Sequence, residues 1–391
     1  MGIHLPLSLM VFFIWSMLGL SSFSRPVEAV PPDDDTIFLI TEGPSSEVYT
    51  TWGHIALRVH KGKNEDLVYG FGDFDFNTSW FYLKFVQGSL NYTGSVLPYG
   101  LFIQLEAEDP HYIVEQALNL TSLEKQAVYR ELDRLNLLEN RFYKYDFLYT
   151  NCSTKIRDVL LAATGSKYMF SKLVPPRSNT FRQELRPYTF GMPWLDFGIN
   201  LVFGLPTDKR ISPYESAFLP ANLRSLCGHA VAADGSRLVL REVLISKAPT
   251  KSFVNGGLSP ELVFWLLLIC CILLSMIRGT GKLIDPIVFL STGLIGFVLF
   301  YLCFISEHAA TRQNFNLVWA LPTNVLYPFV KANARRLYAG FHSLVCAFFL
   351  AFLPFIPQSI EQAVIPLTLL LFFRYLLLLA KPLIPPIIGL N

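Results

Sequence analysis

Residues 149–158 place a cysteine where an apolar-periodic helix begins: Tyr149-Thr150-Asn151-Cys152-Ser153-Thr154-Lys155-Ile156-Arg157-Asp158. Apolar residues then recur at helical spacing as far as Gly165, a residue typical of helix ends. Asn151 is a favourable N-cap, so Cys152 is expected in the first turn, beside free backbone N–H groups and the positive end of the helix dipole. That environment favours the thiolate form, which a nucleophilic cysteine needs. The position alone is equally compatible with a small buried residue or with half of a disulfide.

The composition divides the chain into two parts. Of its 391 residues, 52% are hydrophobic and 16% are charged, which is apolar for a soluble protein. The formal net charge of +2 and the lack of a basic run argue against a nucleic-acid partner. We therefore expect an exported soluble domain at residues 30–258 and a transmembrane helical domain at residues 259–391.

The N-terminus has the pattern of an export signal. Residues 5–20 are almost wholly apolar, and Ala29 ends a small-residue stretch that fits a cleavage site. Few positive charges precede the apolar run, so residues 1–29 form either a signal peptide or an uncleaved N-terminal anchor. In both cases the following domain is expected outside the cytoplasm.

Cysteine usage leaves two interpretations of the exported domain. Of the six cysteines, only Cys152 and Cys227 lie within it, so a disulfide between them is one alternative. No His/Cys cluster has metal-ligand spacing, and the sequence predicts neither a metal site nor a cofactor.

A histidine opens a strand far upstream of the cysteine. Following Gly53, the residues from Ile55 to Val59 alternate between apolar and polar, which places His54 on the face away from the apolar side. A cysteine at a helix start and a histidine on an earlier strand form the papain-type arrangement in circularly permuted order. In that chemistry the imidazole accepts the thiol proton, and the thiolate attacks an ester or amide carbonyl to give a thioester.

Two further roles remain open in this arrangement. The oxyanion would sit against the backbone N–H of Cys152 or Ser153, with the Asn151 side chain as a further candidate donor. A third polar group should orient the imidazole, and the sequence does not choose among its candidates, His60, Tyr69, Asp73 and Asp146.

The remaining elements of the exported domain follow from periodicity. Strands are expected at residues 36–41, 67–76, 90–96, 101–105 and 238–245. Helices are expected at residues 113–118 and after the capping box Thr121-Ser122-Leu123-Glu124. An α+β fold results, with the histidine strand preceding the cysteine helix.

Five apolar stretches predict five membrane spans: Leu262–Ile277, Pro286–Ser306, Gln313–Val330, Leu337–Ile360 and Gln362–Ala380. The third contains Pro322, Asn324 and Pro328, which predicts a broken or re-entrant span. Basic residues fall on the inner side if the soluble domain lies outside. Arg374 would then snorkel or face the helix bundle.

The segment between spans two and three would lie on the outer side, at the depth of the lipid headgroups. It is rich in hydrogen-bonding groups, and the candidate substrate-binding residues within it are His308, Arg312, Asn314 and Asn316. An ordinary solvated loop is the alternative.

The quoted motifs resemble a known family. They are the 52–59 run, the aromatic Tyr69–Phe76 segment, Tyr145-Asp146-Phe147 and the cysteine motif, together with His308, Thr311, Asn314, Asn316, Leu317 and Pro322 in the membrane half. This pattern is similar to the Lnb-type lipoprotein N-acyltransferases. The resemblance implies a permuted papain-like (NlpC/LRAT-like) thiol domain in the periplasm, joined to a multi-pass domain in the bacterial inner membrane. It also implies that Cys152 and His54 move an acyl chain from a phospholipid to the N-terminal amine of a diacylated lipoprotein.

Two other functions compete with this one. A hydrolase of the same fold, either a cell-wall peptidase or a phospholipase, would use water as the acceptor. A non-enzymatic membrane assembly factor would hold Cys152 and Cys227 in a structural disulfide.

Overall fold

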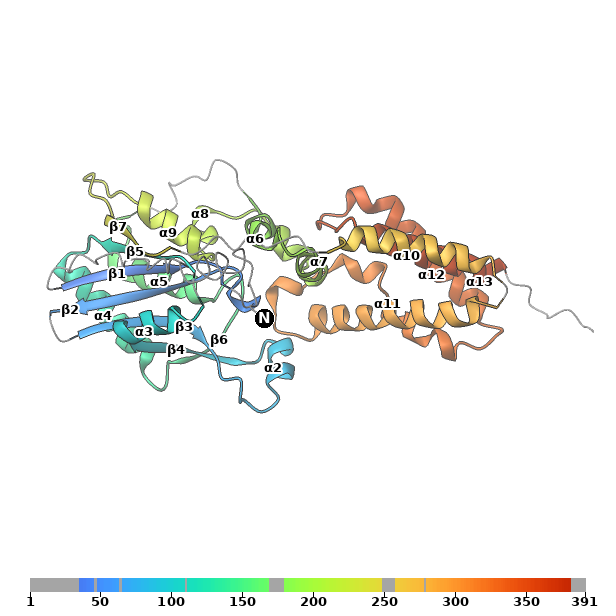
Figure 1. The fold of residues 1–391 in the computed structure, drawn as a ribbon, viewed down its shortest axis with the longest axis horizontal. Coiled ribbons are helices and arrows are strands. Elements are labelled where there is room, and N and C mark those ends of the chain that lie inside the picture. Colours follow the sequence, from blue (N-terminus) through green and yellow to red (C-terminus); the bar gives the residue numbers. More distant parts are fainter. Residues whose placement is uncertain are drawn as a thin grey trace, which may run out of the picture. The chain divides into compact units, whose positions relative to one another are not determined.

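A computed structural model describes residues 35–45, 48–62, 65–109, 111–168, 179–247, 257–277 and 279–380. The expected signal peptide or anchor at residues 1–29 lies outside the described residues. The described chain has an α/β region followed by a helical region, as Figure 1 shows.

An antiparallel seven-stranded sheet forms the centre of the α/β region, with strand order β6-β4-β3-β2-β1-β5-β7. The strands are β1 (Asp35–Glu42), β2 (His54–Lys61), β3 (Glu65–Asp73), β4 (Asn91–Pro98), β5 (Ile113–Leu118), β6 (Phe142–Lys144) and β7 (Val239–Ser246). The register places Glu42 of β1 opposite His54 of β2, so the histidine lies where these two strands end.

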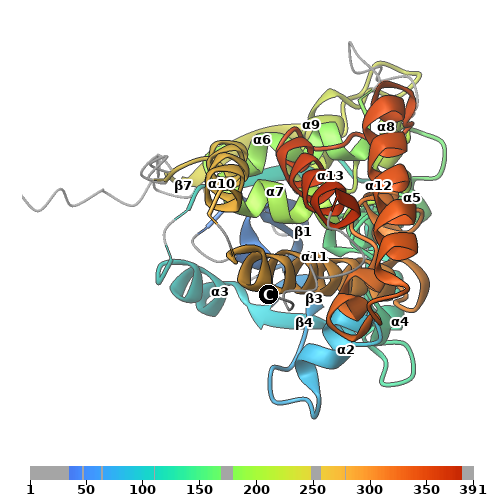
Figure 2. The same ribbon diagram turned by 90° about the vertical axis from the view of Figure 1, so that its right-hand side faces the viewer.

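Helices cover both faces of this sheet, and Figure 2 shows α3 and α4 on opposite sides of the strands. On one face, α4 (Ser122–Asn136), α5 (Cys152–Thr164) and α9 (Pro220–His229) pack over the side chains of Ile55, Leu57 and Val59. On the other face, Phe102 of α3 (Tyr99–Glu106) packs with Ile40, Ala56 and Val68. The remaining helices of the region are α2 (Phe81–Gln87), α6 (Phe181–Thr189), α7 (Pro193–Val202) and α8 (Pro213–Ser216), with 3-10 turns η1 (Val48–Thr50) and η3 (Leu205–Asp208).

Helix α5 begins where the sequence predicts. The Asn151 side chain accepts a hydrogen bond from the Thr154 backbone N–H, and Thr154 Oγ1 in return accepts one from the Asn151 backbone. This reciprocal capping box fixes the first turn. Ile156 and Leu160 are buried in the core, and the helix ends at Gly165. The predicted capping box of α4 is confirmed in the same way.

Two predicted elements are wrong. Residues 101–105 belong to helix α3, and residues 113–118 form strand β5. Every residue of β5 is buried, because β1 and β7 pair with its two edges and helices or loops cover its faces. A short, uninterrupted buried run does not carry the alternation that distinguishes a strand from a helix.

The helical region contains four apolar helices, α10 (Pro260–Ser275), α11 (Gly281–Phe304), α12 (Arg335–Phe352) and α13 (Val364–Ala380). Within the described residues, two stretches are long and apolar enough to cross a membrane by length and composition, Gly281–Phe304 and Arg335–Phe355. The second continues through the 3-10 turn η7 (Leu353–Phe355). Helices α10 and α13 are apolar but shorter.

The expected third span is not an α-helix. Residues 309–329 instead form 3-10 turns η4 (Ala309–Thr311), η5 (Phe315–Val318) and η6 (Pro322–Phe329). They pack closely on α11, where a Cβ on Gly296 would lie 2.0 Å from the Ala320 carbonyl oxygen. Non-helical backbone at membrane depth is tolerated when protein surrounds it, and the broken interpretation of this span is the one that agrees with the structure.

Arg374 faces the helix bundle. Its Nε donates to Asp285 Oδ1 of α11 at 2.7 Å, and both side chains are almost fully buried. Because the two charges neutralise each other inside the bundle, the arginine does not need to extend to the headgroups.

Candidate active site

Cys152 occupies the first position of α5 and lies against the start of β2. The backbone N–H groups of Ser153, Ile55 and Cys152 itself donate to its sulfur. These hydrogen bonds lower the pKa of the thiol. Ile55 directly follows His54, so the sulfur contacts the residue next to the candidate base in the sequence. Cys152 and Cys227 are both free and buried thiols, so the structure does not contain the alternative disulfide.

His54 approaches the same short segment of β3. Its Nε2 lies 3.6 Å from the position that a Cβ on Gly70 would take, and the Cys152 Cβ lies 3.9 Å from the corresponding position on Gly72. β3 is irregular at this point. Its register shifts between Phe71 and Asp73, and Gly72 has a φ of +106°. Both side chains therefore approach the same short segment of β3 at the end of the sheet. The hydrogen bonds of the described residues include none between the two side chains, and such contacts are often loose in substrate-free enzymes.

Burial keeps both groups neutral. Burial raises the pKa of the Cys152 thiol to about 12, which outweighs the neighbouring backbone N–H groups. The expected thiolate is therefore not the resting form. Burial also lowers the pKa of His54, against the opposing effect of the Asp73 and Glu106 carboxylates. A neutral imidazole is the form that can accept a proton from the thiol.

Asp73 is the sequence candidate that acts on His54 most directly, since its carboxylate is the largest electrostatic contribution opposing the lowered pKa of the imidazole. His60 lies six residues along β2, about 20 Å away at the rise of a strand, and its Nδ1 is 3.5 Å from Asp66. Tyr69 is a core residue whose pKa is raised by burial and by Asp133 and Glu65, not by the groups near His54. His60 is therefore too far from His54 to orient it, and a role for Tyr69 stays a prediction.

The Asn151 side chain is already fully engaged. Its Nδ2 donates to the carbonyl oxygens of Phe147 and Phe218, each at 2.9 Å, and its Oδ1 accepts the Thr154 N–H. Both amide protons are thus in use, and Asn151 is wrong as an oxyanion donor. Its role is to cap α5 and hold the cysteine turn.

Asp146 connects the cysteine turn to the helical region. Its Oδ1 accepts the backbone N–H groups of Leu148 and Tyr149, each at 2.9 Å, while its Oδ2 accepts the Ala309 N–H at 3.4 Å. These bonds occupy the carboxylate away from His54, so the structure assigns Asp146 to positioning the loop rather than the imidazole.

Two tyrosines beside Cys152 were missed by the sequence analysis. Burial raises the pKa of Tyr143 and Tyr145, and the nearby Cys152 raises both further. The Tyr143 hydroxyl is buried and has no hydrogen-bond partner among the described residues. Tyr143 lies in β6, and its pairing with Tyr92 of β4 holds this strand near Cys152. No local pattern in the sequence indicates that long-range pairing.

The outer segment contacts the α/β region directly. His308 Nε2 lies 2.9 Å from the Phe85 carbonyl oxygen of α2, the Glu307 backbone N–H donates to Gln87, and the Lys144 and Glu307 side chains form an ion pair. The segment therefore contacts the cysteine domain, although the Lys144–Glu307 ion pair stays exposed.

Asn314 and Asn316 are structural in this segment. Asn314 Nδ2 donates to the carbonyls of Leu201 and Val202, and Asn316 Nδ2 donates to that of Leu201. Both side chains are buried and hold the end of α7, so the expectation that they bind substrate is wrong. Arg312 is exposed, and none of the hydrogen bonds or ion pairs found in the described residues uses its guanidinium.

Two family models match the chain. The model for the Lnb N-terminal periplasmic domain matches residues 22–183, and the model for the Lnb transmembrane domain matches residues 251–382. No curated protein and no solved structure matched the chain. The first match contains His54 and Cys152, and the second contains the outer segment and all four apolar helices. With a periplasmic domain followed by a membrane domain, each matched by its own model, the chain belongs to the Lnb family.

Proposed function

We propose that this protein is an acyltransferase that moves an acyl chain from a membrane phospholipid, through a thioester on Cys152, to the N-terminal amine of a diacylated lipoprotein. The observation that carries the proposal is the position of the cysteine. It begins α5 against the backbone N–H of Ile55, the residue after His54, in a domain whose Asp146 accepts a hydrogen bond from Ala309 of the membrane domain. A permuted papain-like arrangement in the inner membrane, with the acyl donor and acceptor both held in the bilayer, is part of the same proposal.

In the first half-reaction, the neutral His54 takes the proton of the Cys152 thiol as the sulfur attacks the ester carbonyl of the phospholipid. The C–S bond forms and the C–O bond to glycerol breaks. His54 then gives its proton to the departing glycerol oxygen, which leaves as a lysophospholipid. The products are an acyl-cysteine and a neutral base.

In the second half-reaction, the lipoprotein amine attacks the thioester. The C–N bond forms and the C–S bond breaks, while His54 moves one proton from the amine to the sulfur. The thiol is regenerated and an amide is made. No water is consumed, so a donor and acceptor that remain in the membrane suffice.

Stabilisation of the oxyanion would come from groups that already face the sulfur. These are the backbone N–H groups of Cys152 and Ser153. The buried Tyr143 hydroxyl, which has no hydrogen-bond partner among the described residues, would be a third donor. The raised pKa of Tyr143 keeps this hydroxyl protonated, so it is available to donate. Arg312 is the exposed cation best suited to a phosphate headgroup.

The test uses the full chain in proteoliposomes that contain a phospholipid with an alkyne-tagged acyl chain. Without acceptor, the wild type should retain the tag on Cys152 in a hydroxylamine-sensitive bond. With a diacylated lipopeptide, the tag should move to the amine. Cys152→Ala and His54→Ala should each lower transfer by about 10³-fold or more, because nucleophile and base act as a unit. Cys227→Ser, which changes a buried thiol outside the site, is the matched control.

Two results would contradict the proposal. Tag retained on the Cys152→Ala variant would exclude Cys152 as the nucleophile. Release of free fatty acid at the same rate with and without lipopeptide would identify water as the acceptor and support the hydrolase.

A further inference from the structure

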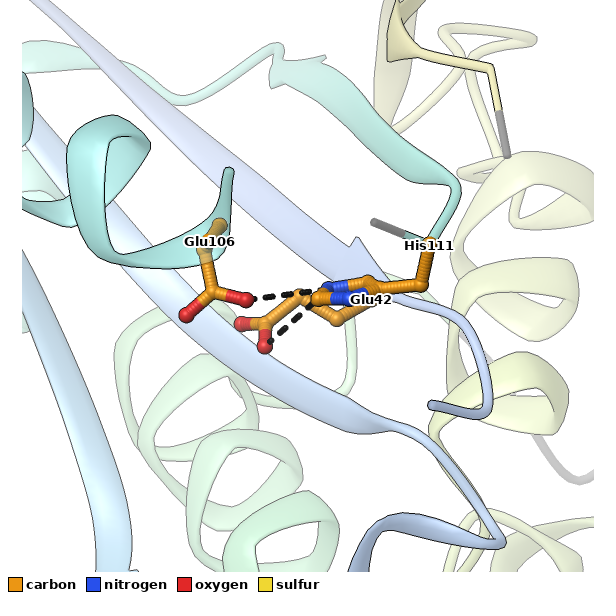
Figure 3. Close-up of side chains that lie close together, drawn as sticks. All are labelled: Glu42, Glu106 and His111. Carbon is orange, nitrogen blue, oxygen red and sulfur yellow. Dashed lines mark ion pairs between the residues drawn. The ribbon is translucent and has the colours of Figure 1, made fainter. Parts of the chain in front are cut away.

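Three side chains that the proposed reaction does not use converge at the end of β1, as Figure 3 shows. Glu42 is the last residue of β1, Glu106 is the last residue of α3, and His111 precedes β5. His111 Nε2 lies 3.0 Å from Glu106 Oε2 and 3.9 Å from Glu42 Oε2. One ligand atom from each of the three lies within 4.8 Å of the others, so a single ion could contact all three.

The orientation of the His111 ring is fixed by a backbone contact. Its Nδ1 lies 2.7 Å from the Asp109 carbonyl oxygen, and a carbonyl can only accept, so Nδ1 carries the proton. In the neutral ring, Nε2 then directs its lone pair at the two carboxylates. Histidines that bind metals use this arrangement, with the second ring nitrogen donating to a carbonyl or carboxylate.

The polar atoms of this cluster lack partners although they are buried. Glu42 is 7% exposed and His111 is 5% exposed. Neither Glu42 Oε1 nor His111 Nε2 has a hydrogen-bond partner among the described residues, and His111 Nε2 meets the two carboxylates only as ion pairs, which need a protonated ring. A buried carboxylate and a buried lone pair destabilise the fold unless a partner satisfies them. A bound cation would satisfy all three groups at once.

The backbone around the cluster is held independently of any ion. The Gly43 N–H donates to the Tyr112 carbonyl at 2.8 Å, joining the chain after β1 to the chain before β5. A Cβ on Gly43 would lie 2.4 Å from the Tyr112 ring, so only glycine permits this approach. Two of the three ligands, Glu42 and His111, each lie next to this junction.

We propose that Glu42, Glu106 and His111 form a binding site for one divalent cation of the zinc class. One imidazole and two carboxylates suit Zn²⁺ better than Ca²⁺ or Mg²⁺, which prefer six or more oxygen ligands or several retained waters. The ion would tie together β1, α3 and β5. Because Glu42 lies opposite His54, the site also fixes the end of the sheet from which the histidine projects. The proposal does not rest on the proposed acyl transfer, although Glu106 acts electrostatically on His54 and Glu42 acts on Cys152.

The test measures binding of Zn²⁺ alone by the purified full chain in detergent. After treatment with a chelator and dialysis against Zn²⁺, the wild type should retain one zinc ion per chain by elemental analysis. Glu106→Gln and His111→Ala should each weaken Zn²⁺ binding by at least the roughly 100-fold that loss of an outer-shell partner can cost, because each removes a ligand. Glu108→Gln, which changes an exposed carboxylate two residues from Glu106, should bind as the wild type does.

Binding of Co²⁺ identifies the ligands. The site predicts a spectrum without the intense near-ultraviolet band of a cobalt–thiolate bond. That band, or unchanged stoichiometry in both Glu106→Gln and His111→Ala, would overturn the proposal by placing the ion on cysteines or elsewhere. Absence of retained Zn²⁺ in the wild type would also overturn it. Glu106→Gln conserves the shape of the side chain, and labelling of the buried Cys227 thiol reports whether each variant is folded.

Discussion

Helix α3 crosses one face of the sheet with a cluster of buried charges at each end, and the two clusters differ in how their charge is balanced. At its first residue, Tyr99, the ring lies 3.4 Å from the Arg58 guanidinium, which also donates to Glu115 at 3.0 Å and to Asp66 at 2.8 Å. At its last residue, Glu106 meets Glu42 and His111, and no arginine or lysine is paired with them in the described residues.

The difference separates a structural role from a functional one. Each charge around Arg58 has an opposite charge or a ring beside it, and nothing is left for a ligand to satisfy. Around Glu42, burial and Glu106 raise the pKa of the Glu42 carboxyl to about 8, which outweighs the opposite effect of His111. A buried carboxylate whose charge is not balanced by the protein has to bind a proton or a cation.

The largest expected effect is at the balanced end. Arg58→Met leaves Glu115 buried without its partner, which should destabilise the fold by about 3–5 kcal/mol. Labelling of Cys227 by a thiol reagent under native conditions measures this loss, since that buried thiol reacts only when the core opens. The double variant Arg58→Met/Glu115→Leu should recover most of the stability. A cost for Arg58→Met within about 1 kcal/mol would contradict the role of the pair.

The next effect is at the unbalanced end and depends on pH. In metal-free protein, Glu42 holds its proton up to a pKa of about 8 when folded, but loses it near its ordinary pKa of 4.5 when unfolded. The folded state thus binds more protons, so stability falls as pH rises through this interval, by about 1.4 kcal/mol per pH unit at most. His111, whose pKa is raised first by Glu106, adds a decline of the same sign above pH 6.5. His54, whose pKa is lowered by burial, opposes it only below 6.5.

Glu42→Gln should therefore remove Glu42's share of the decline between pH 6.5 and 8, a difference of about 2 kcal/mol from the wild type at the upper end. Cys227 labelling across this range, in the presence of a chelator, measures it. Saturating Zn²⁺ should flatten the wild-type profile, because a bound cation favours the ionised carboxylate. Parallel profiles of wild type and Glu42→Gln without metal would show that Glu42 is already ionised in the fold.

Local patterns predicted one part of the site and could not predict the other. The cysteine helix was predictable because Asn151, Thr154 and Gly165 act within a few residues of one another. Glu42, Glu106 and His111 come together only in the fold. Glu42 is far from the other two in the sequence, so a search for metal ligands at close sequence spacing does not find them. The same reason applies to Asn314. The sequence suggests a substrate-binding residue, but its side chain donates to the carbonyls of Leu201 and Val202, which are distant in the sequence. Composition predicted the membrane region. It did not predict the 3-10 turns in place of a third helix, or their close approach to Gly296 of α11.

The smallest effect compares two aspartates of the same strand. Asp73 acts on His54 and Asp66 bonds Arg58, so neutralising each should affect a different property. Asp73→Asn should lower kcat for acyl transfer by roughly tenfold, equal to about 1.4 kcal/mol, and move the acidic limb of the pH–rate profile to lower pH. The shift follows because the Asp73 carboxylate raises the pKa of the imidazole, and its loss lets burial lower that pKa further. Asp66→Asn should leave kcat and the profile unchanged while weakening the fold. If both variants lower kcat equally with unshifted profiles, Asp73 supports the strand rather than the histidine, and the third polar group must be sought among the tyrosines beside Cys152.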